Sequence, residues 1–155
     1  MSRRGAVVAN VAWWAAVHSL TGYLVHRLPA ARLRHDLVAL RPWERALYER
    51  LGVRRWKDRL PEAGALFAGG VSKRHLPSPS AAGLERFVVE TRRAELGHVL
   101  AALGGPPAAL WNPPAGAVAM VAYGVAVNAP FVAVQRYNRA RAVRALARST
   151  GRSIP

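Results

Sequence analysis

The chain has 155 residues, of which 52% are hydrophobic, and it carries a formal net charge of +15. This combination is unlike that of an ordinary soluble domain, and the absence of cysteine excludes a disulfide framework, a cysteine-ligated zinc site and a thiol nucleophile. The hydrophobic and the basic residues are concentrated in different parts of the chain. Residues 99–134 contain no Asp, Glu, Lys, Arg or His, and most basic residues lie between Arg27 and Arg93 or after Gln135. Apolar blocks flanked by Lys and Arg predict an integral membrane protein.

The first predicted element is an apolar helix over residues 5–25, which is long enough to cross the hydrocarbon core of a bilayer, since a span needs about 20 residues. Its basic opening, Ser2-Arg3-Arg4, also resembles the start of a signal peptide. We favour a retained helix, because the apolar run is long and because His26 and Arg27 occupy the place where a peptidase needs small neutral residues.

Residues 26–83 predict a basic interfacial collar. Turn signals interrupt this block, and one short helical pattern runs from Trp43 to Trp56. Its aromatic residues are expected at headgroup depth and its cations near lipid phosphates.

Residues 84–103 have apolar positions at helical spacing, but the first half of this helix is heavily charged. A charge near the bilayer centre costs roughly 2.5 to 3.5 kcal/mol, so we expect the helix to begin in the cytoplasmic interface and to bury only its neutral end, residues 99–103, in the membrane. Gly104-Gly105-Pro106-Pro107 is expected to end it. The pattern leaves open whether this segment crosses the bilayer or re-enters.

The last predicted span covers residues 115–134, after Asn112-Pro113-Pro114. It contains Pro130, which is expected to kink the helix or to free a backbone carbonyl near Asn128. A basic tail, residues 135–155, follows it, with partial disorder left open. The predicted fold is all-α: one small membrane domain, residues 1–155, with two or three bilayer helices and an amphipathic collar. By the positive-inside rule, the charged segments and the C-terminus face the cytoplasm in the cell membrane, and residues 104–114 lie outside.

Several strings, in order between Arg50 and Arg144, resemble the glycosyl-4,4'-diaponeurosporenoate acyltransferase family. They are Val53-Arg54-Arg55-Trp56-Lys57, Lys73-Arg74-His75-Leu76, residues 89–98 (VETRRAELGH), Trp111-Asn112-Pro113 and Gln135-Arg136-Tyr137-Asn138-Arg139. The chain departs from the family pattern at Val99, where tryptophan usually follows the histidine. The resemblance implies transfer of a fatty acyl group to a sugar hydroxyl of a membrane-dissolved glycosylated carotenoid or similar glycolipid. No cofactor is expected, and an acyl donor such as an acyl carrier thioester is the co-substrate.

The residues themselves offer a candidate catalytic group in the charged helix. Acyl transfer to an alcohol needs a base for the hydroxyl proton and donors for the oxyanion. His98 is the candidate base, Glu95 lies on the same helical face and is expected to orient it, and Glu90 is a more distant member of that stripe. The plainer interpretation of a Glu and a His at this spacing is a solvated salt-bridge network.

The candidate substrate-binding residues are Arg92, Arg93, His75, Lys73, Asn112, Arg136, Asn138 and Arg139. Arginine forms bidentate bonds with carboxylate or phosphate, so one of Arg92 and Arg93 is expected to pair with Glu95 or with an anionic group of the donor. The group at residues 136–139 is either a stop at the headgroups or a clamp for the phosphates of an acyl carrier. Asn112 and Asn128 are expected to bond backbone near prolines, with donation to an oxyanion as the alternative for either. His75 is expected to contact headgroups.

Other classes of function fit less well. The Glu95-x-x-His98 spacing also occurs in di-iron carboxylate bundles, but those use the pair twice, so we expect no metal site. The basic residues bracket membrane segments without a recognition module, so we expect no nucleic acid partner. The rival hypothesis is a non-enzymatic scaffold that binds anionic lipid for lipid-modifying enzymes. The expected partners are membrane lipids, the acceptor and the donor, with a homo-oligomer left open.

Overall fold

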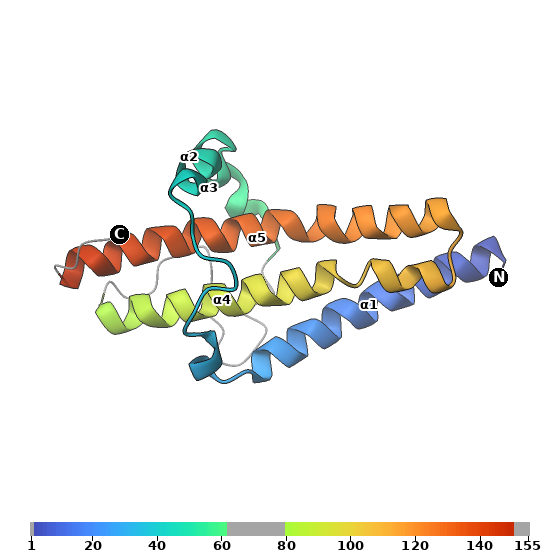
Figure 1. Ribbon diagram of the computed structural model, residues 1–155, viewed down its shortest axis with the longest axis horizontal. Coiled ribbons are helices and arrows are strands. Elements are labelled where there is room, and N and C mark those ends of the chain that lie inside the picture. Colours follow the sequence, from blue (N-terminus) through green and yellow to red (C-terminus); the bar gives the residue numbers. More distant parts are fainter. Residues whose placement is uncertain (1, 62–79, 151–155) are drawn as a thin grey trace.

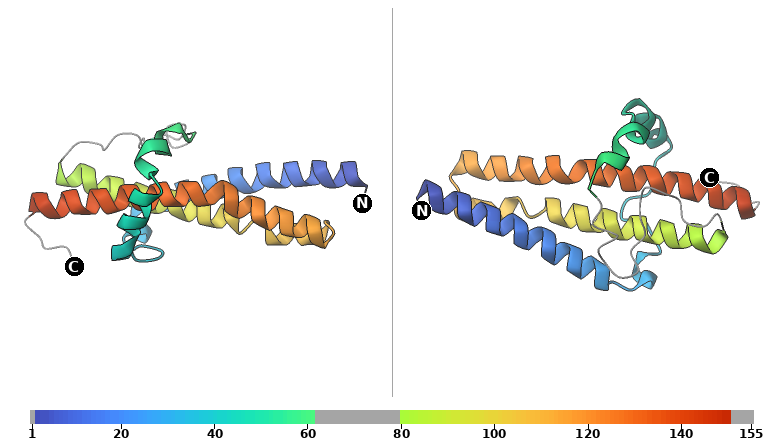
Figure 2. Two further views of the ribbon diagram at one scale, coloured as in Figure 1. Left: turned by 90° about the horizontal axis from the view of Figure 1, so that it is seen from above. Right: turned by 180° about the vertical axis from the view of Figure 1, so that it is seen from behind.

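The computed structural model describes residues 2–61 and 80–150, and this part of the chain is helical, without a strand. The all-α prediction is therefore confirmed. Three long helices, α1, α4 and α5, lie side by side along the long axis of the molecule (Figures 1 and 2). The elements are α1 (Arg3–Arg27), η1 (Ala30–Leu33), α2 (Pro42–Arg50), α3 (Val53–Trp56), η2 (Lys57–Arg59), α4 (Ala81–Ala102), η4 (Pro106–Leu110) and α5 (Pro114–Thr150).

Helix α1 extends the predicted first span by two residues at each end. The Ser2 side chain caps its start by accepting a hydrogen bond from Gly5 N at 3.1 Å. The helix ends at Arg27 because Leu28 is extended, as expected for a residue that precedes a proline. The N-terminus lies at the same end of the molecule as the start of α5 (Figure 1).

The collar contains two short helices where the sequence predicted one pattern from Trp43 to Trp56. Pro42 opens α2, and the Glu44 carboxylate accepts a hydrogen bond from Arg41 N at 2.8 Å at the helix start. The break between α2 and α3 falls at Gly52, whose φ of +62° lies in the left-handed region that favours glycine. Both helices stand beside the charged half of α5 (Figure 1).

Helix α4 begins three residues before the predicted Leu84. The reason is a cap: the Ser80 hydroxyl accepts a hydrogen bond from Gly83 N at 3.2 Å. The helix ends at Ala102, near the predicted stop, and η4 continues the chain to the turn that opens α5 (Figure 1). Helix α4 makes most of its contacts with α5.

Helix α5 is one continuous helix of 37 residues through the region where the sequence suggested a separate tail. At 1.5 Å per residue it is about 55 Å long, against roughly 30 Å for the hydrocarbon core of a bilayer. Among the described residues it provides the one helix, Pro114–Ser149, that is long and apolar enough to span a membrane. Pro130 lies inside α5, which continues past it.

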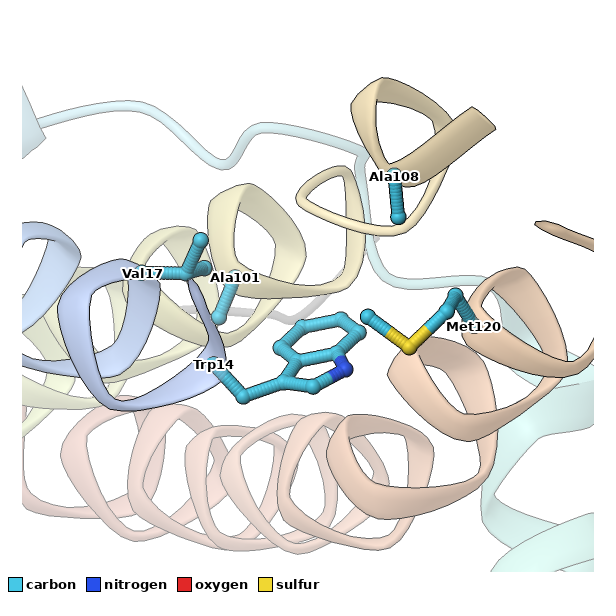
Figure 3. Close-up of a cluster of buried hydrophobic side chains, with 5 residues drawn as sticks. All are labelled: Trp14, Val17, Ala101, Ala108 and Met120. Atoms are coloured by element: carbon cyan, nitrogen blue, oxygen red, sulfur yellow. The ribbon is translucent and has the colours of Figure 1, made fainter. Parts of the chain in front are cut away.

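The apolar halves of the helices pack through small residues around an indole. Trp14 and Val17 of α1 meet Ala101 of α4, Ala108 of η4 and Met120 of α5 in one buried cluster (Figure 3). The approach is close: a Cβ added at Gly124 would lie 2.7 Å from Cη2 of Trp14. These helices also leave large apolar side chains exposed, as expected of a surface that faces lipid. They include Val7, Val8, Val11, Leu20, Leu24, Leu100, Leu103, Leu110, Val118, Val121 and Val125.

Candidate functional site

The Glu95 side chain lies at the centre of a buried ion-pair network between α4 and α5. It is 3% exposed. Its Oε1 accepts a hydrogen bond from Nη1 of Arg136 at 2.7 Å, and Nη2 of Arg139 lies 2.5 Å from its Oε2. Arg136 and Arg139 are three residues apart on α5, so both reach the same face of α4.

Arg136 also joins α5 to the collar. Its Nε and Nη2 donate to the two carboxylate oxygens of Glu44 at 2.7 and 2.6 Å, and Nη1 and Nη2 donate to the carbonyls of Val38 and Ala39. With Glu95 this makes five acceptors for the five N–H donors of a guanidinium. All of its donors are therefore used within the protein, which leaves none for an anionic group of a substrate.

Arg139 extends the network to the segment after α1. Its side chain is fully buried, and its Nε lies 3.0 Å from Oδ1 of Asp36. The same carboxylate oxygen accepts a hydrogen bond from Nε of Arg92 at 2.7 Å, and Arg92 also donates to the carbonyls of Leu33 and Arg34. Three carboxylates, those of Asp36, Glu44 and Glu95, thus face three guanidiniums, and the buried cluster is balanced in charge.

Arg93 and Glu90 form a second link, toward the end of α1. The Arg93 Nε donates to the Glu90 carboxylate at 3.2 Å. Its Nη1 donates to the carbonyls of Val25 and Leu28, at 2.5 and 2.7 Å, where α1 ends. Since the last carbonyls of a helix lack partners within the helix, Arg93 serves as a cap from another element.

His98 has different neighbours from those expected. Its Nδ1 lies 3.0 Å from Oδ1 of Asn128 on α5, and its ring stacks on Phe131 with centroids 4.5 Å apart and planes 14° apart. The structure thus brings His98 together with Asn128 and Phe131, while the carboxylate of Glu95 faces the two arginines. Glu95 and His98 lie one turn apart on α4, and the Glu95 carboxylate accepts a hydrogen bond from Arg136.

Two side chains of the network that belong to the collar, Glu44 and Tyr48, have shifted pKa values. Burial raises the pKa of the Glu44 carboxyl, but hydrogen bonds from Arg136, Arg41 N and Tyr48 outweigh it and lower the pKa to about 2. Burial and the hydrogen bond that the Tyr48 hydroxyl donates to Glu44 raise the pKa of Tyr48 to about 12. Both groups therefore hold one protonation state across the physiological range.

Asn112 lies in the turn before α5, away from the network. Its amide nitrogen donates to Oδ1 of Asn10 at 2.8 Å and the Asn10 amide donates back at 3.0 Å, while Nε1 of Trp111 donates to Asn10 at 2.7 Å. These bonds fasten the start of α1 to the turn before α5. Asn138 is buried on α5. Lys73 and His75 fall outside the described residues.

The described residues contain no group of three His, Cys, Asp or Glu side chains placed to hold a metal ion. They form a cavity of about 630 Å³ between α1 and α5 in the apolar half, and its lining includes none of the predicted site residues. It is lined by Asn10, Val11, Trp14, Ala15, His18, Gly116, Ala119, Met120 and Tyr123.

Sequence reasoning missed Asp36 and Glu44, and it expected Asn128 to bond backbone or to donate to an oxyanion, not to contact His98. A signal for the first two was available: the chain has only eight acidic residues against 23 basic ones, so each carboxylate is a candidate partner for a buried arginine. Asn128 is a polar amide inside an otherwise apolar predicted span, where a polar side chain needs a hydrogen-bond partner.

Comparison with known proteins agrees with the motifs. The model of the glycosyl-4,4'-diaponeurosporenoate acyltransferase family matches residues 32–148. A protein of that name from Staphylococcus aureus strain USA300 is 27% identical over 140 residues, which cover 83% of this chain and 81% of the relative. Its counterpart from the bovine strain RF122 / ET3-1 is 31% identical over 101 residues, 64% of this chain and 57% of the relative. No solved structure matches. The chain therefore belongs to the glycosyl-4,4'-diaponeurosporenoate acyltransferase family, and its class of activity is acyl transfer.

Proposed function

We propose that this chain is a membrane acyltransferase that transfers a fatty acyl group from a thioester donor to a sugar hydroxyl of a glycosylated carotenoid or similar glycolipid, with His98 as the base. The proposal extends the family's class of activity to a substrate type and a residue. The observation that carries it is the place of His98, which lies where the buried ion pairs end and the uncharged halves of α4 and α5 begin.

That position suits a reaction between two amphipathic substrates. A polyene and an acyl chain are stable in hydrocarbon, whereas a sugar and the carrier end of a donor need polar surroundings. Their reacting ends meet at the boundary, where an imidazole is able to take the hydroxyl proton as the oxygen attacks the acyl carbonyl. Holding both substrates at this depth lowers the entropic cost of bringing them together.

The ion-pair network supports this site and does not bind the donor. Arg136 uses its donors on Glu44, Glu95 and two carbonyls, and Arg139 is fully buried. We assign Glu95, Arg136 and Arg139 to holding α4, α5 and the collar in register around His98. An anionic donor would instead meet exposed cations of the collar, such as Arg54 and Arg55 on α3.

The exposed apolar side chains around α1 and the first half of α5 support placement in the membrane, with the arginine-rich half in the cytoplasm. Residues 104–114 and the N-terminus then lie at the outer surface. Helix α5 is the candidate span by length and hydropathy, and we assign α1 and the α4–η4 run to the same layer because they flank its apolar half (Figure 2).

The test is product formation from a glycosylated diaponeurosporenoate and an acyl carrier thioester in membranes that contain matched amounts of each variant. His98→Ala is expected to lower turnover by about 10²- to 10⁴-fold, the usual contribution of a general base. His35→Ala removes an exposed imidazole from the collar and is the matched control, expected to retain turnover. Normal turnover in His98→Ala would reject His98 as the base, and absence of product with the unaltered chain would reject this pair of substrates.

A further inference from the structure

The contact between His98 and Asn128 has a defined direction. Asn128 is 1% exposed, and its Nδ2 donates to the carbonyl oxygen of Gly124 at 2.9 Å, one turn earlier on α5. A carbonyl oxygen only accepts, so this bond assigns the amide nitrogen to the Gly124 side and Oδ1 to the His98 side.

The amide orientation in turn assigns the proton on the imidazole. An amide oxygen has no hydrogen to give, so the 3.0 Å contact requires that Nδ1 of His98 carries the proton and donates it to Oδ1 of Asn128. In the neutral ring the lone pair is then on Nε2. This is the arrangement by which a second group fixes the tautomer of a catalytic histidine.

The ring is restrained in a second direction as well. Phe131, three residues after Asn128 on α5, stacks on it with planes 14° apart. The hydrogen bond fixes rotation of the ring within its plane, and the stack fixes the plane itself. Both restraints come from one face of α5.

We infer that Asn128 is a positioning residue of the proposed acyl transfer: it holds His98 in the tautomer that has Nε2 as the base. The inference rests on the proposed function. As the acceptor oxygen bonds to the acyl carbon, its O–H bond breaks and Nε2 takes the proton. When the carbon–sulfur bond of the thioester then breaks, the leaving thiolate takes that proton from Nε2, and the ring returns to its starting state.

An amide suits this depth better than a carboxylate would. Asn128 lies in the uncharged stretch of α5, where an ionised side chain costs roughly 2.5 to 3.5 kcal/mol. A neighbouring carboxylate would also raise the pKa of the imidazole, whereas a neutral acceptor orients it without that charge. The charged groups nearby in sequence are Glu95 on α4 and Arg136 and Arg139 on α5, and the carboxylate of Glu95 pairs with both arginines. Helix α1 packs Val25 against this part of α4, at Gly97.

The test compares Asn128→Leu with Asn128→Asp. The leucine has a similar size but no acceptor, so kcat per folded molecule is expected to fall by at least about tenfold, with KM little changed. The loss should stay below that of removing the base itself, which is about 10²- to 10⁴-fold. The aspartate keeps an acceptor for Nδ1–H, so it is expected to retain more activity than the leucine, and the acidic limb of its pH–rate profile is expected to move to higher pH.

Val125→Ala, at an exposed position on the same helix, is the control for general effects of altering α5. Folded protein is measured by thermal unfolding in detergent and by the level in membranes. An unchanged kcat in Asn128→Leu would overturn the inference. So would a loss of activity in both variants that is fully explained by a lower amount of folded protein, together with an unchanged pH–rate profile. If His98→Ala is inactive but Asn128→Leu is normal, only this inference fails. An active His98→Ala rejects the proposed base itself.

Discussion

Arg136 of α5 and Glu44 of α2 form a bidentate ion pair, with Nε to Oε2 at 2.7 Å and Nη2 to Oε1 at 2.6 Å. Arg136→Lys keeps the charge but reduces five donors to three, which leaves two buried acceptors without partners. Each such loss costs about 1 to 3 kcal/mol, so we expect a lower free energy of unfolding in detergent. Arg45→Lys, in the exposed pair with Glu49, is the control and is expected to change stability by less than about 1 kcal/mol. Unchanged stability in Arg136→Lys would contradict the network's structural role.

The lowered pKa of Glu44 predicts how stability depends on pH. A carboxyl whose pKa falls from 4.5 to about 2 on folding contributes stability that is fully present above pH 4.5. This contribution is lost as the pH falls through about 2, because protonation then breaks the pairing with Arg136. The free energy of unfolding, measured by chemical denaturation between pH 7 and 2, is expected to fall in acid. Glu44→Gln should be less stable at pH 7 and should show a shallower slope, and an equal slope would argue against this assignment.

Glu95 and His98 are expected to affect different quantities. Glu95→Gln weakens pairing with two buried arginines, so its main effect should be on stability, where breaking a buried pair costs roughly 3 to 5 kcal/mol. His98→Ala should mainly lower turnover. Because the two act separately, a double-mutant cycle on turnover per folded molecule should be close to additive. A large loss of turnover per folded molecule in Glu95→Gln alone, together with a double variant no worse than His98→Ala, would instead restore the dyad that the sequence suggested.

Gly124 gives Trp14 room against α5. A Cβ at this position would lie 2.7 Å from Cη2 of Trp14 and 2.9 Å from the carbonyl oxygen of Ala102. Gly124→Ala is therefore expected to destabilise the fold by about 1 to 3 kcal/mol. Trp14→Phe removes the conflicting ring atom, so the double variant should lose less than the sum of the two single losses in thermal unfolding. Strict additivity would show that the two residues are not in contact.

The proposed topology is testable because the chain has no cysteine. Leu110 is 87% exposed in η4, and Ser149 is exposed near the end of α5. An impermeant thiol reagent added to intact cells should label Leu110→Cys and leave Ser149→Cys unlabelled until the cells are opened. The opposite pattern would reverse the orientation.

The apolar and charged blocks were enough to predict the three long helices, because long apolar runs and the proline start of α5 are local signals, but they did not predict that α5 continues through residues 135–150. The start of α4 was placed late because the cap at Ser80 lies in a stretch that also reads as a turn. The break at Gly52 was missed because a positive φ is a property of one residue inside a continuing helical pattern.

The pairing of side chains was less predictable than the helices. Spacing along α4 suggested that Glu95 serves His98, but spacing says nothing about a second helix, and α5 offers Glu95 two arginines and His98 an amide. Likewise, nothing local in residues 30–50 indicates that Asp36 and Glu44 meet residues about 100 positions later. Long-range ion pairs depend on the packing of elements and cannot be read from periodicity.

The continuity of α5 has a consequence for changes in chain length. Asn128 and Phe131, which face His98, share one rigid helix with Arg136 and Arg139, which face Glu95. Each added residue turns the remainder of a helix by about 100° and advances it by 1.5 Å. A single alanine inserted after Val132 would therefore leave the histidine contacts in place and rotate both guanidiniums away from their carboxylates, stranding buried charges of both signs. Insertions and deletions between residues 131 and 136 should consequently be far more damaging than substitutions there.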